Sequence, residues 1–299
     1  MATAVIVTRD ASVVRVRFEA SNEIHILSSE TRQTLSEELE KIACDETVRV
    51  VIFEARGRTF LAGADLAELQ GLHQDSAIWY AEAGQKLMNQ VARLRPVTIC
   101  AIQAACAGGG CELALACDVR LAAAGARIGL PETSLGLIPG WGGTVRSTQL
   151  FGGAVARRMI LSGELLPSAE ALRIGLVDQV FADAEFAQGV EGVVAHLLTR
   201  GPSALKRAKR LISQLTRSGM KKALAREARE FAECYASLEP LEGVGSFREK
   251  RSPSWMATSN ASGNASGKTE SESTDTEATS AEAPGGTSAA KRKAKKKTE

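Results

Sequence analysis

Histidine and aromatic residues are scarce in this sequence of 299 residues, which holds three histidines and 4% aromatic residues. The three histidines lie far from one another, and no cluster of His, Asp and Glu accompanies them, so we expect no metal site. A G-x-S-x-G segment is also lacking, which weighs against a serine hydrolase triad. Any catalysis must therefore depend on other residue types.

Long apolar runs are missing as well. No run approaches the ~18 residues that a membrane helix needs, so the sequence predicts no membrane span. Residues 1–10 lack the charged-then-apolar pattern of a secretory signal. The six cysteines form no C-x-x-C pair and are interpreted as small hydrophobic residues of a reducing compartment. We therefore expect a soluble protein in the cytoplasm.

Charge is nearly balanced, with a formal net charge of +2, but it is unevenly distributed. The last nine residues hold six Lys or Arg and one Glu, and the rest of the chain has 31 basic and 34 acidic residues. A slightly acidic body is not typical of a general nucleic-acid-binding protein, so nucleic acid is not expected as a partner.

Apolar patterning divides the chain into three regions. Residues 1–200 alternate between strands, expected near 5–7, 13–18, 48–53 and 97–102, and helices, expected near 29–44 and 76–94, which indicates an α/β fold with mixed sheets. Residues 201–255 favour helix only, and residues 256–299 are rich in Ser, Thr, Gly and Glu. We expect this low-complexity tail, with its basic end, to be disordered.

A triple glycine lies where a buried strand gives way to a helix. The strand at 97–102 precedes Gly108–Gly110, and a helix is expected to begin near Glu112. Bare backbone N–H groups at the positive end of a helix can hold a polarised carbonyl, and glycines let its oxygen approach. The pattern is that of an oxyanion hole with a carboxylate beside it. Tight strand–helix packing would give the same pattern.

Two glutamates follow glycine or proline in this region, twenty residues apart. Glu112 opens the helix, and Glu132 follows Pro131 in an expected loop. If the chain brings them together, the two carboxylates would share protons and suit general acid–base catalysis. From spacing alone, a helix-capping Glu112 and a solvated Glu132 remain an open interpretation.

Six segments, in order over residues 3–255, resemble the crotonase (enoyl-CoA hydratase/isomerase) family. They are 60–66 (FLAGADL), 107–114 (AGGGCELA), 131–140 (PETSLGLIPG), 161–164 (LSGE), 171–178 (ALRIGLVD) and 242–251 (EGVGSFREKR). The resemblance implies a spiral of ββα units, a C-terminal helical trimerisation region over 201–255, and homotrimers or homohexamers built from two trimers. It also implies a role in fatty-acid metabolism.

The resemblance further implies the site residues. Glu112 and Glu132 would be catalytic, and the N–H groups of Ala62 and Gly109 would form the oxyanion hole for a thioester carbonyl. Substrate-binding positions would be Ala62, Gly63, Ala64, Asp65, Leu66, Gly108, Pro131, Gly140 and Trp141. Phe247 and Lys250 would contact coenzyme A from a neighbouring subunit. Coenzyme A is part of the substrate, so no separate cofactor is expected.

Having both glutamates is the hydratase pattern, that is, the addition of water to a 2-enoyl-CoA. Alternatives within the family are an enoyl-CoA isomerase and a hydratase specialised for branched or alicyclic acyl groups. Trp141 occupies a position often held by a small residue, and its indole would shorten the acyl pocket or merely pack. An RNA-binding hydratase homologue is a further alternative, suggested by the basic residues within 205–210 and by the basic C-terminus.

Overall fold

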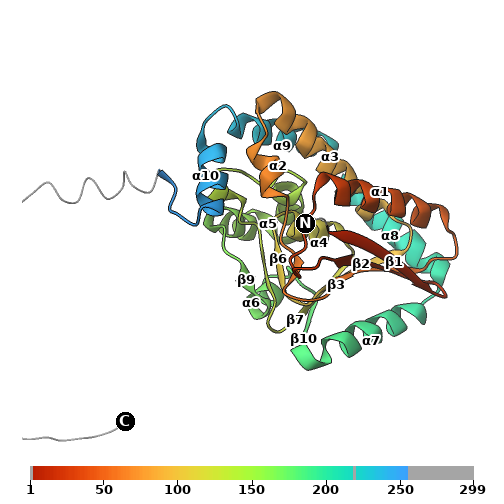
Figure 1. The fold of residues 1–299 in the computed structure, drawn as a ribbon. Helices are drawn as coiled ribbons and strands as arrows, with labels where there is room; N and C mark the ends of the chain where they lie inside the picture. Colours follow the sequence, from red (N-terminus) through yellow and green to blue (C-terminus); the bar gives the residue numbers. More distant parts are fainter. Residues whose placement is uncertain (1–2, 218–219, 255–299) are drawn as a thin grey trace, which may run out of the picture. The chain divides into compact units, whose positions relative to one another are not determined.

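The computed structural model describes residues 3–217 and 220–254, which form two sheets covered by helices (Figure 1). The larger sheet has the strand order β1-β2-β3-β5-β7-β10. Its strands are β1 (Ala4–Asp10), β2 (Val13–Glu19), β3 (Val50–Ala55), β5 (Val97–Ile102), β7 (Val119–Ala123) and β10 (Gln179–Phe181). Only the β1–β2 pair is antiparallel, and the other pairs are parallel.

A smaller sheet follows the order β4-β6-β8-β9. Its strands are β4 (Thr59–Leu61), β6 (Ala105–Ala107), β8 (Arg127–Gly129) and β9 (Leu166–Pro167). Each of the strands β3, β5 and β7 of the larger sheet is followed within a few residues by a strand of the smaller one. This repeated ββ unit with helices between the turns is the crotonase-like spiral, so the expected fold class is confirmed.

The helices and 3₁₀ turns complete the chain order. They are α1 (Ser29–Cys44), α2 (Leu66–Gln70), α3 (Gln74–Arg93), α4 (Gly109–Ala116), η1 (Glu132–Leu135), α5 (Gly143–Ser162), α6 (Ser168–Arg173), η2 (Asp183–Glu185), α7 (Phe186–Leu198), α8 (Pro202–Arg217), α9 (Met220–Cys234) and α10 (Glu239–Arg248). The expected helix at 29–44 and strand at 97–102 are confirmed residue for residue. Helix α3 begins at Gln74 rather than 76 because His73 caps it, accepting a hydrogen bond from the N–H of Ser76.

The C-terminal helices pack onto the core. Helix α9 runs along α3, and α10 lies against α2 (Figure 1). Phe231 and Ala228 of α9 are buried with Ala77 and Ala81 of α3. The inward face of the region expected to oligomerise is therefore used within the subunit, while Leu238 and Phe247 remain exposed.

One of the basic residues within 205–210 is occupied inside the fold. Lys209 of α8 is largely buried and pairs with Asp118 at 2.6 Å. Cys44 is exposed rather than buried, whereas the four cysteines between 100 and 117 are buried.

In the described ranges, no helix combines the length and apolar character needed to cross a membrane. The same ranges hold no group of three His, Cys, Asp or Glu side chains placed to bind a metal ion. The expected disordered tail at 256–299 lies outside the described residues and stays a prediction.

Candidate active site

The glycine triplet forms the junction of β6 and α4. Gly108 has a φ of +52°, a backbone conformation that suits glycine, and its N–H donates to the carbonyl of Gly129 at 3.1 Å. A Cβ on Gly108 would lie 3.3 Å from Oε1 of Glu132, and a Cβ on Gly110 would lie 2.4 Å from the carbonyl oxygen of Leu61. The triplet therefore serves both the close packing of strand on helix and access to a carboxylate.

Glu112 lies in the first turn of α4 and is 2% exposed. Its Oε1 accepts hydrogen bonds from the N–H groups of Trp141 and Gly143, each at 2.8 Å. Burial raises the pKa of Glu112 to about 7, and these two amides and the Arg146 charge oppose the rise. The helix-capping interpretation is wrong, because the side chain binds a distant loop and not its own helix.

Glu132 begins η1, a single 3₁₀ turn where a loop was expected. Its Oε2 is buried and has no hydrogen-bond partner in the described part of the chain. Burial raises the pKa of Glu132 well above its usual range, and the Glu112 charge raises it further. The solvated interpretation of Glu132 is wrong.

Both carboxylates line one cavity. Every expected substrate-binding residue except Asp65 lines it with them. Six lining residues were missed: Leu69, Tyr80, Leu135, Leu137, Ile138 and Phe231. They are apolar or aromatic residues of helices and loops, and nothing in their local sequence distinguishes them from core residues. Glu112 and Glu132 are the only charged residues in this lining.

The structure contradicts the expected role of the Ala62 N–H in the oxyanion hole. This N–H donates a hydrogen bond to the carbonyl of His25 at 2.7 Å and is not available to a substrate. The turn at Gly63 and Ala64 instead faces the glycine junction: a Cβ on Gly63 (φ +111°) would lie 3.6 Å from the amide nitrogen of Gly109. The N–H of Ala64 has no acceptor among the described residues. Ala64 and Gly109 thus present two amide groups to the same cavity.

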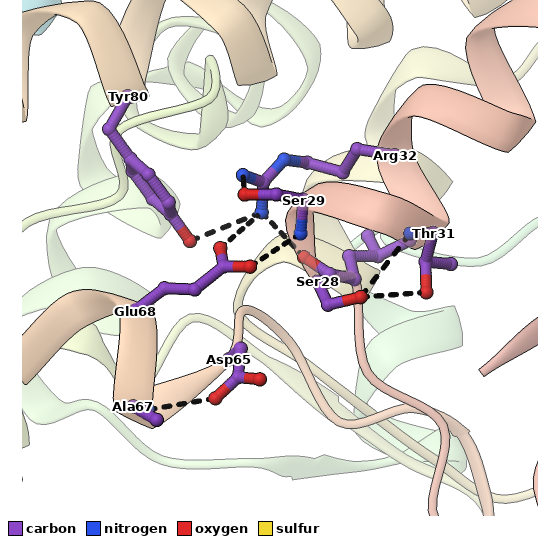
Figure 2. Close-up of polar contacts among 9 residues, drawn as sticks. Ser28, Ser29, Thr31, Arg32, Asp65, Ala67, Glu68 and Tyr80 are labelled. Carbon is purple, nitrogen blue, oxygen red and sulfur yellow. Dashed lines mark hydrogen bonds and ion pairs between the residues drawn. The ribbon is translucent and has the colours of Figure 1, made fainter. Parts of the chain in front are cut away.

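Asp65 has a structural position. Its carboxylate caps α2, accepting from the N–H of Ala67 at 2.8 Å (Figure 2). Figure 2 also shows Arg32 of α1 reaching toward this region, where its guanidinium donates to Glu68 at 3.1 Å and to the Tyr80 hydroxyl at 3.3 Å. These bonds attach α1 to α2 and α3 behind the cavity.

Aromatic side chains form one wall of the cavity. The rings of Tyr80 and Trp141 lie 5.6 Å apart, and those of Tyr80 and Phe231 lie 6.2 Å apart. The Arg32 guanidinium stacks on Tyr80 at 4.6 Å and Trp141 at 5.0 Å. Arg32 pairs with Glu68 and stacks on the two rings, so it supports the wall from outside the cavity lining.

Trp141 both packs and borders the cavity. Its indole is 2% exposed and fills the space beside two glycines: a Cβ would lie 2.0 Å from the ring at Gly84 and 2.4 Å from it at Gly109. The two interpretations of Trp141 offered by the sequence are therefore compatible.

Phe247 and Lys250 do not line the cavity. Phe247 is 61% exposed on α10, and Lys250 follows that helix with a φ of +55°. Their expected contact with coenzyme A from a neighbouring subunit stays a prediction.

Comparison with known proteins agrees with this architecture. Residues 8–258 match the family described as Enoyl-CoA hydratase/isomerase. The chain is 31% identical to the short-chain-enoyl-CoA hydratase of Clostridium acetobutylicum, covering 83% of this chain and 95% of that protein. It is 32% identical to the 2,3-dehydroadipyl-CoA hydratase of Escherichia coli, covering 83% and 96%.

A solved structure of an enoyl-CoA hydratase from Mycobacterium avium subsp. paratuberculosis superposes with a TM-score of 0.76 at 30% identity, covering 85% of this chain and 98% of that one. The family match spans most of the sequence, and the fold agrees with it. The chain belongs to the enoyl-CoA hydratase/isomerase (crotonase) family and is an enzyme of that family.

Proposed function

We propose that the protein is an enoyl-CoA hydratase that adds water across the α,β double bond of a 2-enoyl-CoA. The observation that carries this proposal is a pair of glutamates on one cavity beside two free amides: Glu112 is buried, and Glu132 has a buried Oε2. Both carboxylates hold the water. One carboxylate takes a proton from the water as the hydroxyl bonds to Cβ, and a proton is delivered to Cα on the same face. The product is therefore the substrate plus one water.

The thioester oxygen gains negative charge as the hydroxyl adds. We assign its stabilisation to the N–H groups of Gly109 and Ala64, since the N–H of Ala62 is already bonded. Each such donor typically contributes about 3–4 kcal/mol to lowering the barrier. Gly109 also opens α4, so the positive end of the helix dipole adds to its effect.

The raised pKa values of the two glutamates support shared proton chemistry. Two carboxylates buried in one cavity resist ionising together, so near neutral pH the pair holds a proton that it can donate while the other group accepts. Because the two titrate as a pair, neither is assigned as the sole acid or base.

The cavity wall supports an uncharged, short or cyclic acyl group. Tyr80, Trp141 and Phe231 close the wall, and no Lys or Arg is present among the described residues that line the cavity. A distal carboxylate, as in the substrate named for the Escherichia coli relative, would be buried without a cation, which is unfavourable. Crotonyl-CoA and small cyclic enoyl thioesters fit this chemistry.

Assembly and location are proposed on the family resemblance. We infer a homotrimer or a dimer of trimers acting in the cytoplasm on fatty acyl thioesters. Exposed apolar residues on the last helical region, Leu238, Leu241 and Phe247, support an assembly through that region.

The test is the loss of enoyl-thioester absorbance with crotonyl-CoA for wild type, Glu112→Gln and Glu132→Gln. Wild type should turn over, and each variant should lose about 10²–10⁴-fold in kcat. If Glu112→Gln loses hydration but still moves a double bond from the 3 to the 2 position, the isomerase alternative is favoured. If no enoyl-CoA of any chain is hydrated, the hydratase proposal is wrong.

A further inference from the structure

A third glutamate is buried next to the catalytic pair, and no motif marks it. Glu227 of α9 is 4% exposed. Its Oε2 accepts from the N–H of Thr144 at 3.1 Å, and its Oε1 is buried with no partner in the described ranges. A buried carboxylate with an unpartnered oxygen costs stability, so its presence so near the reaction needs a reason.

One buried cation, Arg146 of α5, serves this region and is 4% exposed. Its two terminal nitrogens donate to the carbonyl of Trp141 and to Oδ1 of Asn89, each at 2.9 Å. In the described chain it makes no direct ion pair with either Glu112 or Glu227. Its charge therefore acts on both carboxylates through space, and it lowers the pKa of both.

The segment 139–144 connects these groups. Glu112 is held by two of its amides, those of Trp141 and Gly143. The segment in turn is held by Arg146 at the Trp141 carbonyl and by Glu227 at the Thr144 amide. Gln85 of α3 adds a third bond, donating to the carbonyl of Gly140 at 3.0 Å. Side chains from α3, α5 and α9 thus fix the loop that orients Glu112.

We propose that Glu227 is a positioning residue of the site: with Arg146 it fixes the loop that orients Glu112, and once ionised it places a negative charge beside the catalytic pair. This inference rests on the proposed hydratase function. Glu227 does not line the cavity, so it acts through the loop and through its charge, without touching the substrate.

The surrounding charges are consistent with this role. Burial and the Glu112 charge raise the pKa of Glu227 to about 8, and the Glu227 charge is one of the causes that raise the pKa of Glu132. Glu82 and Lys86 of α3 line a groove beside Leu224, and Lys209 of α8 is paired with Asp118. Among the described residues, Arg146 is the buried cation whose charge acts on both Glu112 and Glu227.

The experiment compares Glu227→Gln with Glu230→Gln in full pH profiles of crotonyl-CoA hydration. Glu230 is the matched control, because it lies three residues along α9 and is exposed. Glutamine keeps the acceptor for Thr144 but removes the charge. The alkaline limb of the kcat profile of Glu227→Gln, where Glu227 would be ionised, should move to lower pH by about 0.5 unit, while the acid limb stays in place and KM stays within about twofold of wild type. Glu230→Gln should show no shift.

Comparing Glu227→Ala with Glu227→Gln separates the effect of the charge from the effect of the hydrogen bond that holds the loop. Glu227→Ala removes the acceptor as well, so its kcat should fall about tenfold or more below that of Glu227→Gln. If Glu227→Gln lowers kcat equally at every pH, or only lowers the melting temperature, Glu227 is structural and the inference is wrong.

An inactive wild type would contradict the hydratase proposal and still leave the charge coupling measurable. In that case the pH dependence of thermal unfolding tests the charge coupling of Glu227. Wild type should lose stability from about pH 5 to about pH 8, and Glu227→Gln should lose less over the same range. Identical profiles would overturn the coupling.

Discussion

Replacing Gly84 with alanine should destabilise the protein, although the same change usually strengthens a helix. Gly84 lies inside α3, where alanine is ordinarily favoured over glycine by about 1 kcal/mol. Here the new Cβ would lie 2.0 Å from Cδ1 and 2.2 Å from Nε1 of the Trp141 ring. Such distances are far inside van der Waals contact, so the ring or the helix must shift.

The ring has little room to retreat. Its far edge rests on Gly109, where a Cβ would lie 2.4 Å from Cζ3, and the Trp141 amide is held by Glu112. Overpacking of this kind costs about 1–3 kcal/mol, with the upper end expected where both sides are fixed. After subtracting the helix gain, we expect the free energy of unfolding to fall by about 1–2 kcal/mol.

Urea unfolding measures the effect, and the chain offers a matched control. Gly192 lies inside α7, and a Cβ there would meet no atom within 4 Å. Gly192→Ala should therefore stabilise by about 0.5–1 kcal/mol. Gly84→Ala combined with Trp141→Leu should cost less than the sum of the two single changes, because the smaller side chain removes the clash. A Gly84→Ala variant as stable as wild type, or additive costs in the double variant, would refute the packing argument.

Three further expectations follow from the same geometry. Trp141→Leu should open the cavity wall and raise the rate with decenoyl-CoA relative to crotonyl-CoA by about tenfold, measured as the ratio of kcat/KM values. Arg32→Met should lower the free energy of unfolding by about 2–3 kcal/mol, since it leaves Glu68 without its cation and removes the stacking on two rings; Arg32→Lys should lose less. Glu227 is neutral in the fold up to about pH 8 but ionised above about pH 4.5 in the unfolded chain, so wild-type stability should fall as pH rises between these values. Glu227 contributes at most about 5 kcal/mol to this fall, which should be smaller in Glu227→Gln when urea unfolding is repeated across this pH range.

Local sequence was sufficient for much of the fold. Ser28 caps the helix at 29–44, whose apolar residues recur at regular spacing. The strand at 97–102 is a run rich in β-branched residues that Pro96 precedes. Such elements are determined by neighbours in sequence, so they could be predicted. Glu112 and Glu132 could be found as well, because glycine and proline mark the turns beside them.

The oxyanion assignment shows where local sequence was insufficient. The segment 62–65 reads A-G-A-D, so two alanines have equivalent surroundings in sequence. The structure distinguishes them through a non-local contact, because the chain at 25–27 pairs with this loop and takes the N–H of Ala62. No pattern within the loop encodes that pairing.

Arg146 and Glu227 were missed for a related reason. Each is a charged residue in a helix, where charged residues are usually solvated, and the sequence places them 81 positions apart. Only the packing of α9 against α3 and α5 buries them beside Glu112. Their role depends on burial, which single-residue identity does not reveal.

Selectivity for the acyl group and acid–base chemistry share one residue in this site. The indole of Trp141 forms the cavity wall, and its backbone amide holds the carboxylate of Glu112. Burial is the largest cause that raises the pKa of Glu112, and the indole of Trp141 lines the same cavity. A wall opened for longer acyl groups would admit water, return the pKa of Glu112 toward its ordinary value, and weaken its ability to hold a proton at neutral pH. Under the proposed hydratase function, the length of the acyl pocket and the protonation state of Glu112 would therefore depend on the same residue.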